Sequence, residues 1–422
     1  MDQKLLRLPN NLNVLSTQLP STKSVTVLIL VGTGSRYENK IINGVAHFAE
    51  HMFFKGTKKR PTALDISTLI DGIGGEFNAF TSKEYTGYFV KASAEKVDLV
   101  LDVLSDMLLN SKFDQEEIDR ERGVIFEELR MYLDTPVRHI HDVYEQLLFG
   151  DQPLGWDIVG SLESLKNINR KEFLEFKNSY YNPENMLVSI AGGIKHSDIE
   201  NYTKNYLGNL ENKKTATYNK VKISQNKPAV KLSEKKTEQA HLAIGVRSYP
   251  RGHKNRYIAA VLNTILGSSM SSRLFIELRE RRGLAYYVRA GIEEYHDAGS
   301  FVASAGVPPK KIGEAIKVIL DEFNKITGEK VGEKELKKTK EHIKGRLILE
   351  LEDSREVAAL FGSQQLLEGK VRSVEEIFTK IDAVSAEDIK KVAADIFKNE
   401  ALNLAIIGPY KDEGKFVKIL KL

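Results

Sequence analysis

The 422-residue sequence contains no cysteine, one tryptophan and only 11 prolines. The absence of cysteine excludes disulfides, thiolate metal sites, iron–sulfur clusters and cysteine nucleophiles, so any metal must be bound by His, Asp or Glu. The formal net charge is only +4, which gives no reason to expect a nucleic acid or an acidic membrane surface as partner. With 41% hydrophobic and 28% charged residues, the composition is that of a globular protein rather than a disordered or fibrous one.

Long hydrophobic runs are also absent. The most apolar stretch, residues 25–31 (VTVLILV), has the length of a strand, whereas a membrane-spanning helix needs about 20 apolar residues. The N-terminal segment MDQKLLRLPNNLNV has neither the apolar region of a signal peptide nor the Arg/Ser-rich composition of a transit peptide. We therefore expect a protein without a membrane span that stays in the cytoplasm.

The two halves of the sequence resemble each other at a constant shift of 216 residues. Ile168–Gly192 aligns without a gap to Val384–Gly408, and apolar positions of the first segment fall on apolar positions of the second, as Phe173 does on Ile389. In both segments the apolar period changes from about 3.6 to about 2, which predicts a helix followed by a strand. The shift is close to half the chain, which favours an internal duplication over a chance likeness of two helix–strand units.

A chain of this length exceeds a single core, which stops growing near 250–300 residues, so about two domains are expected. The lysine-rich stretch 212–236 has few large apolar residues and predicts a linker between an N-terminal domain at 1–211 and a C-terminal domain at 237–422. Hairpins are predicted at 76–90 and 285–307. The expected fold class is α+β, with two similar domains, each a mostly antiparallel sheet with helices packed on one face.

The sequence His47-Phe48-Ala49-Glu50-His51 is the strongest sign of chemistry. Residues i, i+3 and i+4 of a helix share a face, so His47, Glu50 and His51 point the same way. Mostly apolar neighbours imply burial, and a buried carboxylate between two imidazoles is destabilising unless it is paired. Zn²⁺ suits this donor set, and HxxEH inverts the HExxH helix of metalloproteases. The alternative is a core His pair beside an ion-paired Glu, because short motifs recur by chance.

A third ligand is expected on the helix that starts near Phe113. Glu121 and Glu128 lie seven residues apart within an apolar stripe, where ion-pair partners should be few. Glu127 lies on another face, within reach of Arg130, and fits a solvated ion pair. Either Glu128 or Glu121 is therefore the better ligand candidate, and Glu127 is the worse one.

These motifs resemble the pitrilysin/insulinase family of zinc metallopeptidases, and most of all its half-length branch, which includes bacterial peptidases and the catalytic subunit of mitochondrial processing peptidase. The resemblance covers essentially the whole chain and rests on HFAEH at 47–51 with FKGT at 54–57, Gly74-Gly75 with Asn78-Ala79, Glu121-Arg122 with Glu128, Pro153-Leu154-Gly155, and YNPENM at 181–186. It implies that His47, His51 and Glu128 bind one Zn²⁺ per chain. It also implies that Glu50 is the general base and that Glu121 is a supporting catalytic carboxylate.

The resemblance further implies where substrate binds. In the family a peptide lies extended along an edge strand, here expected at residues 76–80, with Phe77, Asn78 and Ala79 in contact with it. The family also has an Arg and a Tyr seven residues apart that contact substrate, and these map to Arg279 and Tyr286. This pair has two alternatives. The basic run RERR at a helix end interacts favourably with the helix macrodipole whatever its function. The adjacent Tyr287 is a competing candidate for the tyrosine.

The second half has no equivalent of the metal motif. Shifted by 216, the two histidines and the glutamate fall on Asn263, Leu266 and Gly267, which cannot bind zinc. We therefore expect the C-terminal domain to be a structural or substrate-binding partner.

The function that the resemblance implies is a zinc-dependent endopeptidase or oligopeptidase, in which Glu50 activates the metal-bound water that attacks peptides or unfolded segments. A homodimer is expected, because one chain carries both the zinc motif and the Arg/Tyr pair. The alternatives are a catalytic or scaffold subunit of a heteromeric processing peptidase and a non-catalytic binding protein on the same fold. The retained motif argues against the last, since a scaffold has no physical need for a buried charge cluster.

Overall fold

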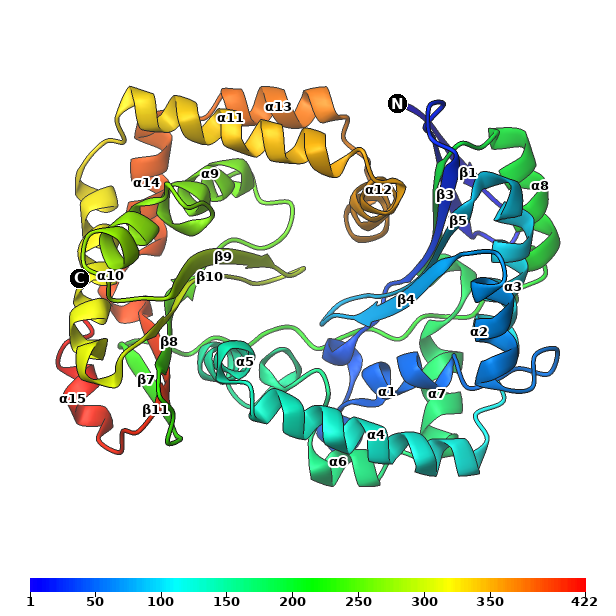
Figure 1. The fold of residues 1–422 in the computed structure, drawn as a ribbon, viewed down its shortest axis with the longest axis horizontal. Helices are drawn as coiled ribbons and strands as arrows, with labels where there is room; N and C mark the ends of the chain where they lie inside the picture. Colours follow the sequence, from blue (N-terminus) through cyan, green and yellow to red (C-terminus); the bar gives the residue numbers. More distant parts are fainter. The chain divides into compact units, whose positions relative to one another are not determined.

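The computed structural model describes all 422 residues, which form two compact units (Figure 1). The first unit comprises residues 1–129, 157–219 and 348–372, and the second comprises 130–156, 220–347 and 373–422. Each unit combines one sheet with several helices, so the predicted α+β class is confirmed.

The first unit is built on a six-stranded sheet with the order β1-β2-β6-β3-β5-β4. Its strands are β1 (Asp2–Arg7), β2 (Asn13–Gln18), β3 (Ser24–Val31), β4 (Glu76–Thr81), β5 (Thr86–Ser93) and β6 (Met186–Gly192). All neighbours are antiparallel except β2 and β6, and β4 forms one edge of the sheet. Strands β3 and β6 are continuous apolar runs, and they are buried almost throughout because both of their faces are covered.

Most helices of the first unit cover one face of its sheet. Helix α1 packs against β4, α3 against β3 and β5, and α8 against β2. The helices of this unit, apart from one discussed below, are α1 (Val45–Met52), α2 (Ala63–Asp71), α3 (Val97–Asn110), α4 (Gln115–Leu133), α6 (Leu162–Lys166), α7 (Arg170–Tyr180) and α8 (His196–Leu207). Helix α4 starts in the first unit and runs four residues into the second.

The second unit repeats the same topology with five strands in the order β7-β11-β8-β10-β9. They are β7 (Ala229–Glu234), β8 (Ala240–Arg247), β9 (Tyr287–Glu294), β10 (Gly299–Val307) and β11 (Asn403–Gly408). Again one pair, β7 with β11, is parallel and the others are antiparallel. This order equals that of the first sheet without β1, which confirms the predicted duplication.

The helices of the second unit follow the duplication as well. Helix α14 is the counterpart of α7 at the shift of 216, and both are followed by a buried strand. The main core lies between the sheet and α9, α10 and α14. The helices are α9 (Arg256–Gly267), a short π-helix at Phe275–Glu280, α10 (Ile312–Gly328), α11 (Glu333–Glu350), α13 (Val374–Asp382), α14 (Ala386–Ile396) and α15 (Glu413–Val417).

Two helices are exchanged between the halves of the sequence. Helix α12 (Ser354–Glu368), from the second half, packs on β3 and β6 of the first unit, on the face opposite α3 and α8 (Figure 1). There Ser189 donates a hydrogen bond of 2.8 Å to the carbonyl of Ala358. Conversely, α5 (Pro136–Phe149), from the first half, packs on β8 and β11 of the second unit, where Tyr144 donates to the carbonyl of Phe301.

Because of this exchange, the compact units differ from the continuous domains predicted at 1–211 and 237–422. The apolar period of a helix shows which of its faces is buried, but it does not show which sheet buries that face.

The segment predicted as a linker, 212–236, also differs in part from the expectation, because it contains strand β7. Val230 and Leu232 are partly buried against the core, and β7 pairs in parallel with β11. Strand β7 is the counterpart of β2 at the shift of 216. Lys231, which stands between Val230 and Leu232, concealed this strand in the sequence.

Candidate metal centre

Helix α1, which carries the HxxEH motif, is held at its N-terminus by a buried carboxylate. Glu38 accepts hydrogen bonds from the backbone N–H groups of Gly44 and Ala46, both at 2.7 Å, and from Nδ2 of Asn43 at 2.8 Å. Burial raises the pKa of Glu38 to about 8, although these three hydrogen bonds oppose the rise. Gly44 has a φ of 98°, which favours glycine. The first turn, whose N–H groups need partners, is therefore fixed by Glu38.

Three of the predicted ligands converge in the first unit. His47 and His51 lie one turn apart on α1, and Glu128 reaches them from α4. Nε2 of His47 lies 3.7 Å from Oε1 of Glu128, and Nε2 of His51 lies 3.5 Å from Oε2 of Glu128. One donor atom from each of the three residues lies within 4.8 Å of the other two. Figure 1 shows α1 and α4 beside each other in this unit.

This cluster fits a zinc ion. Its atom pairs are too far apart for good hydrogen bonds, but ligands at about 2.0–2.2 Å in a tetrahedron lie about 3.4 Å from one another. Oε2 of Glu128 and Nδ1 of His47 are both buried and have no hydrogen-bond partner. Burial, together with His51, lowers the pKa of His47 to about 3, so this imidazole is neutral, as a metal ligand must be. A buried acceptor without a donor, such as Oε2 of Glu128, is costly unless an ion binds it.

Glu121 orients the second histidine. Its Oε1 accepts a hydrogen bond of 3.0 Å from Nδ1 of His51, which leaves Nε2 of that ring directed at Glu128. Its Oε2 lies 2.5 Å from Nζ of Lys55. Burial opposes the charged form of Glu121, but the bonds to His51 and Lys55 outweigh burial and lower its pKa. A carboxylate behind a ligating histidine is the usual outer partner in zinc sites.

The same balance acts on His51. Burial disfavours its charged form, but the hydrogen bond to Glu121 and the charges of Glu128 and Glu50 outweigh burial and raise its pKa.

Glu50 lies on α1 between the two histidines and is bound from the sheet. Thr81, at the end of β4, donates a hydrogen bond of 2.5 Å to Oε2 of Glu50. Burial raises the pKa of Glu50, and the hydrogen bond from Thr81 opposes that rise. The carboxylate is thereby fixed beside the cluster without being one of its three donors.

A cavity of about 230 Å³ opens next to the cluster. Phe77, Asn78 and Ala79 of β4 form one side, so the structure brings these three predicted residues together with the motif. The other lining residues are Glu50, His51, Phe54, Lys55 and Glu121. Because β4 is an edge strand, its outer side has no strand partner within the unit.

The predicted Arg/Tyr pair lies in the second unit, and the structure brings its two members into contact. Arg279 donates a hydrogen bond of 2.9 Å to the carbonyl of Tyr286, and its guanidinium lies 5.6 Å from the Tyr286 ring centre. Tyr286 is 74% exposed. Tyr287, the competing residue, is instead hydrogen bonded through its hydroxyl to Nδ1 of His241.

Sequence reasoning did not assign roles to three residues of the site. Lys55 was detectable, since it lies one turn after His51 on the same side. Glu38 and Thr81 gave no signal, because a loop carboxylate and a strand hydroxyl reach the helix only through the tertiary fold.

Comparison with known proteins agrees with the geometry. The family model described as Insulinase (Peptidase family M16) matches residues 13–161, and the model described as Peptidase M16 inactive domain matches residues 167–343. The chain belongs to the insulinase family, M16. The first of these models covers the candidate metal-binding cluster, and the second lies mostly in the half without one, as expected from Asn263, Leu266 and Gly267.

Curated relatives of similar length carry names that point to zinc proteases. The chain is 38% identical to the uncharacterized zinc protease YmxG of Bacillus subtilis, over 95% of this chain and 97% of that one. It is 34% identical to the uncharacterized zinc protease ML0855 of Mycobacterium leprae, over 98% and 94% of the two chains. The family of zinc peptidases expected from the sequence, in its half-length bacterial form, is thus confirmed.

Solved structures support the fold. A protease from Helicobacter pylori is similar with a TM-score of 0.90 at 24% identity, covering 97% of this chain and 99% of that one. A peptidase M16 inactive domain from Pseudomonas fluorescens has the same TM-score at 17% identity, with 97% and 98% coverage. None of the helices combines the length and the apolar character that a bilayer crossing requires.

Proposed function

We propose that this protein is a zinc-dependent endopeptidase or oligopeptidase acting on peptides or unfolded segments. The observation that carries the proposal is the convergence of His47, His51 and Glu128, with Glu50 fixed beside them and an open cavity in front. His47, His51 and Glu128 would hold one zinc ion per chain. When bound, zinc supplies a Lewis acid that polarises a peptide carbonyl and makes water more acidic.

The protein's own residues supply positioning and proton transfer. Glu50 accepts a proton from the attacking water as the C–O bond forms, and then delivers that proton to the amine nitrogen as the C–N bond breaks. Thr81 holds one oxygen of Glu50, whose side chain also lines the cavity. Glu121 acts through His51, whose ring it orients, while Lys55 keeps Glu121 charged.

The edge strand β4 is the proposed binding line for substrate. An extended peptide can pair with the outer side of β4, beside Phe77, Asn78 and Ala79. Main-chain pairing gives affinity with little demand on sequence, so this mode of binding favours a broad range of unfolded peptides over one folded target.

The test is hydrolysis of an internally quenched, unstructured peptide by the full chain. The proposal predicts cleavage that stops when zinc is removed by a chelator and returns when zinc is added back. Cleavage at an undiminished rate by protein shown to be metal-free would refute it.

We further propose that the active form is a homodimer in which Arg279 and Tyr286 of one chain complete the site of the other. One chain carries both the metal cluster and an exposed, contacting Arg/Tyr pair, and a two-fold dimer is the commonest symmetric assembly. A subunit of a heteromeric peptidase has no need for both features on one chain. The cytoplasmic location stays a prediction.

Mixing two inactive variants tests the shared site. Glu50→Gln and Arg279→Ala/Tyr286→Phe are combined under conditions of subunit exchange, with exchange verified by mass. Random pairing makes half of the dimers mixed, each with one intact site of two, so about a quarter of the wild-type activity should return. If verified exchange restores no activity, the pair does not act across chains.

A further inference from the structure

The first unit contains an almost fully buried ion pair between Arg36 and Glu84. Nη1 of Arg36 lies 2.6 Å from Oε1 of Glu84, and both side chains are at most 1% exposed. Neither residue belongs to the metal cluster or lines its cavity. Because two charges are costly to remove from water, such a pair is stable only where the surrounding structure holds it in good geometry.

The ion pair joins the loop that precedes α1 to the turn between β4 and β5. The backbone N–H of Ser35 donates a hydrogen bond of 3.1 Å to the carbonyl of Ser82. The N–H of Arg36 donates one of 2.9 Å to the carbonyl of Lys83. At Gly34 a Cβ would lie only 2.1 Å from the carbonyl oxygen of Ser82, so this approach requires glycine. Loop and turn are therefore packed together as one piece.

Both of these segments hold parts of the candidate metal centre. The loop, residues 33–38, ends at Glu38, which fixes the first turn of α1. The turn, residues 82–85, directly follows Thr81, which donates a hydrogen bond to Glu50. Loop and turn thus hold the two sides of this contact, namely the helix that carries Glu50 and the strand end that carries Thr81.

Arg36 is also contacted by the last residues of the first unit before the chain enters the second, since the unit boundary follows Asn219. The Arg36 guanidinium lies 4.0 Å from the centre of the Tyr218 ring, and its Nη2 donates a hydrogen bond of 3.2 Å to the carbonyl of Asn219. The Tyr218 ring also meets the Tyr37 ring edge to face, with 5.5 Å between their centres. A cation over an aromatic face is held more strongly where water is excluded, as it is at Arg36.

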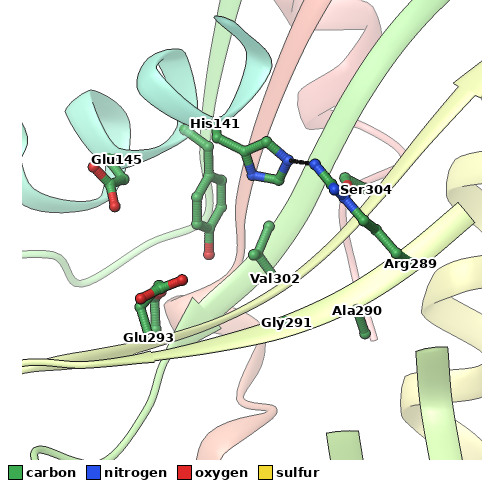
Figure 2. Close-up of a pocket in the computed structure, with 10 residues that line it drawn as sticks. His141, Glu145, Arg289, Ala290, Gly291, Glu293, Val302 and Ser304 are labelled. Atoms are coloured by element: carbon green, nitrogen blue, oxygen red, sulfur yellow. Dashed lines mark hydrogen bonds between the residues drawn. The ribbon is translucent and has the colours of Figure 1, made fainter. Parts of the chain in front are cut away.

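An arginine of the second unit shows that a paired guanidinium does not need such a cover. Nη2 of Arg289 donates a hydrogen bond of 2.8 Å to Nε2 of His141, yet Arg289 stays exposed beside a cavity of about 340 Å³ (Figure 2). The contacts that Tyr218 and Asn219 make with Arg36 are therefore an additional feature of the first unit.

We propose that Tyr218 is a positioning residue, which acts through Arg36 to hold Thr81 against Glu50. This inference rests on the proposed peptidase function, in which Glu50 transfers the proton. Because Tyr218 stands next to the unit boundary, a displacement of the chain there loosens the contact with Arg36, and with it the loop and the turn. The connection to the second unit is in this way coupled to the general base through contiguous packed contacts.

Hydrogen exchange of the full chain, measured by mass spectrometry, tests the coupling in Tyr218→Leu. Tyr218 is half-buried on a segment without helix or strand, so the fold should be retained. Exchange should become about fivefold faster in residues 33–38 and 82–85. Tyr218→Phe, which keeps the ring, should exchange like the wild type. The matched control is Tyr206→Leu, which removes a half-buried tyrosine of α8 that bonds to Asp98 and should leave both segments unchanged.

Initial rates on a quenched peptide separate a positioning role from a merely structural one. Tyr218→Leu should lower kcat by about fivefold and leave KM and the zinc content unchanged, because the base is displaced rather than the substrate or the metal. Tyr218→Phe should restore the wild-type kcat.

The proposal is overturned if Tyr218→Leu leaves exchange in loop and turn unchanged, or if KM or the zinc content changes in place of kcat. If the wild type hydrolyses no peptide, the proposed function fails, whereas the exchange measurement still decides whether Tyr218 holds the loop and the turn.

Discussion

The two units share the order of five strands, but the equivalent helices α1 and α9 pack differently beside the edge strand of their sheets. Helix α1 faces a cavity of about 230 Å³ and presents His51 to it, whereas α9 packs directly on the edge strand of its sheet. At Gly267, the counterpart of His51, a Cβ would lie 2.4 Å from the backbone nitrogen of Ala290. The second unit therefore lacks not only the ligands but also the space for them.

The candidate metal centre therefore requires room between one helix and one edge strand, which the shared fold does not by itself provide. The first unit has this room, whereas in the second unit Gly267 of α9 lies directly against β9.

The largest effect is expected at Glu50. Glu50→Gln keeps the shape and the hydrogen bond from Thr81 but cannot accept a proton, so peptide hydrolysis should fall by about a thousandfold. Glu127→Gln, an exposed glutamate of α4, is the control and should retain activity. The measurement is the initial rate on a quenched peptide. A Glu50→Gln rate near that of the wild type would show that another group takes the proton.

A substitution in the second unit tests how closely α9 packs against the edge strand β9. Gly267→Ala forces a Cβ onto the backbone of β9 and should lower the free energy of unfolding by about 1–3 kcal/mol. Gly313→Ala, which meets no neighbour, should be neutral or slightly stabilising. Denaturant unfolding of both variants checks this, and equal stability of the two would contradict the packing argument.

An effect of similar size is expected at the cap of α1. Glu38→Ala leaves the N–H groups of Gly44 and Ala46 without their partner and should destabilise the protein by about 1–3 kcal/mol, while the exposed Glu95→Ala should have almost no effect. Unfolding monitored by circular dichroism measures both.

The cap also predicts a pH dependence. The pKa of Glu38 is raised in the folded state from 4.5 to about 8, so the folded state binds more protons between these values. The contribution of this group to stability is then full below pH 4.5 and declines as the pH rises toward 8. The stability difference between wild type and Glu38→Ala should therefore be larger at pH 5 than at pH 8. A difference that grows with pH would contradict the raised pKa.

Much of the site could be predicted because residue spacing in a helix shows which side chains share a face. His47, Glu50 and His51 had to share a face, and Glu128 was one of two glutamates in an apolar stripe. The resemblance to a family then separated Glu128 from Glu121, and the structure places them as cluster member and outer partner.

The rest depended on contacts between distant segments. No period links Glu38 or Thr81 to α1. Nor does any local pattern reveal that α5 and α12 cover the sheets of the opposite halves, since an amphipathic helix packs equally well on either apolar sheet face. The strand β7 was concealed for a related reason, because its one lysine, Lys231, bonds to Gln146 of the exchanged helix α5.

The zinc content of the purified chain and of three variants decides whether His47, His51 and Glu128 form a metal centre. We expect one zinc ion per chain for the wild type, for Glu50→Gln and for Glu127→Gln. Glu128→Gln should lose most of its zinc, because Glu128 reaches both histidines. Two zinc ions per chain, no zinc in the wild type, or equal zinc loss in Glu127→Gln and Glu128→Gln would contradict this expectation.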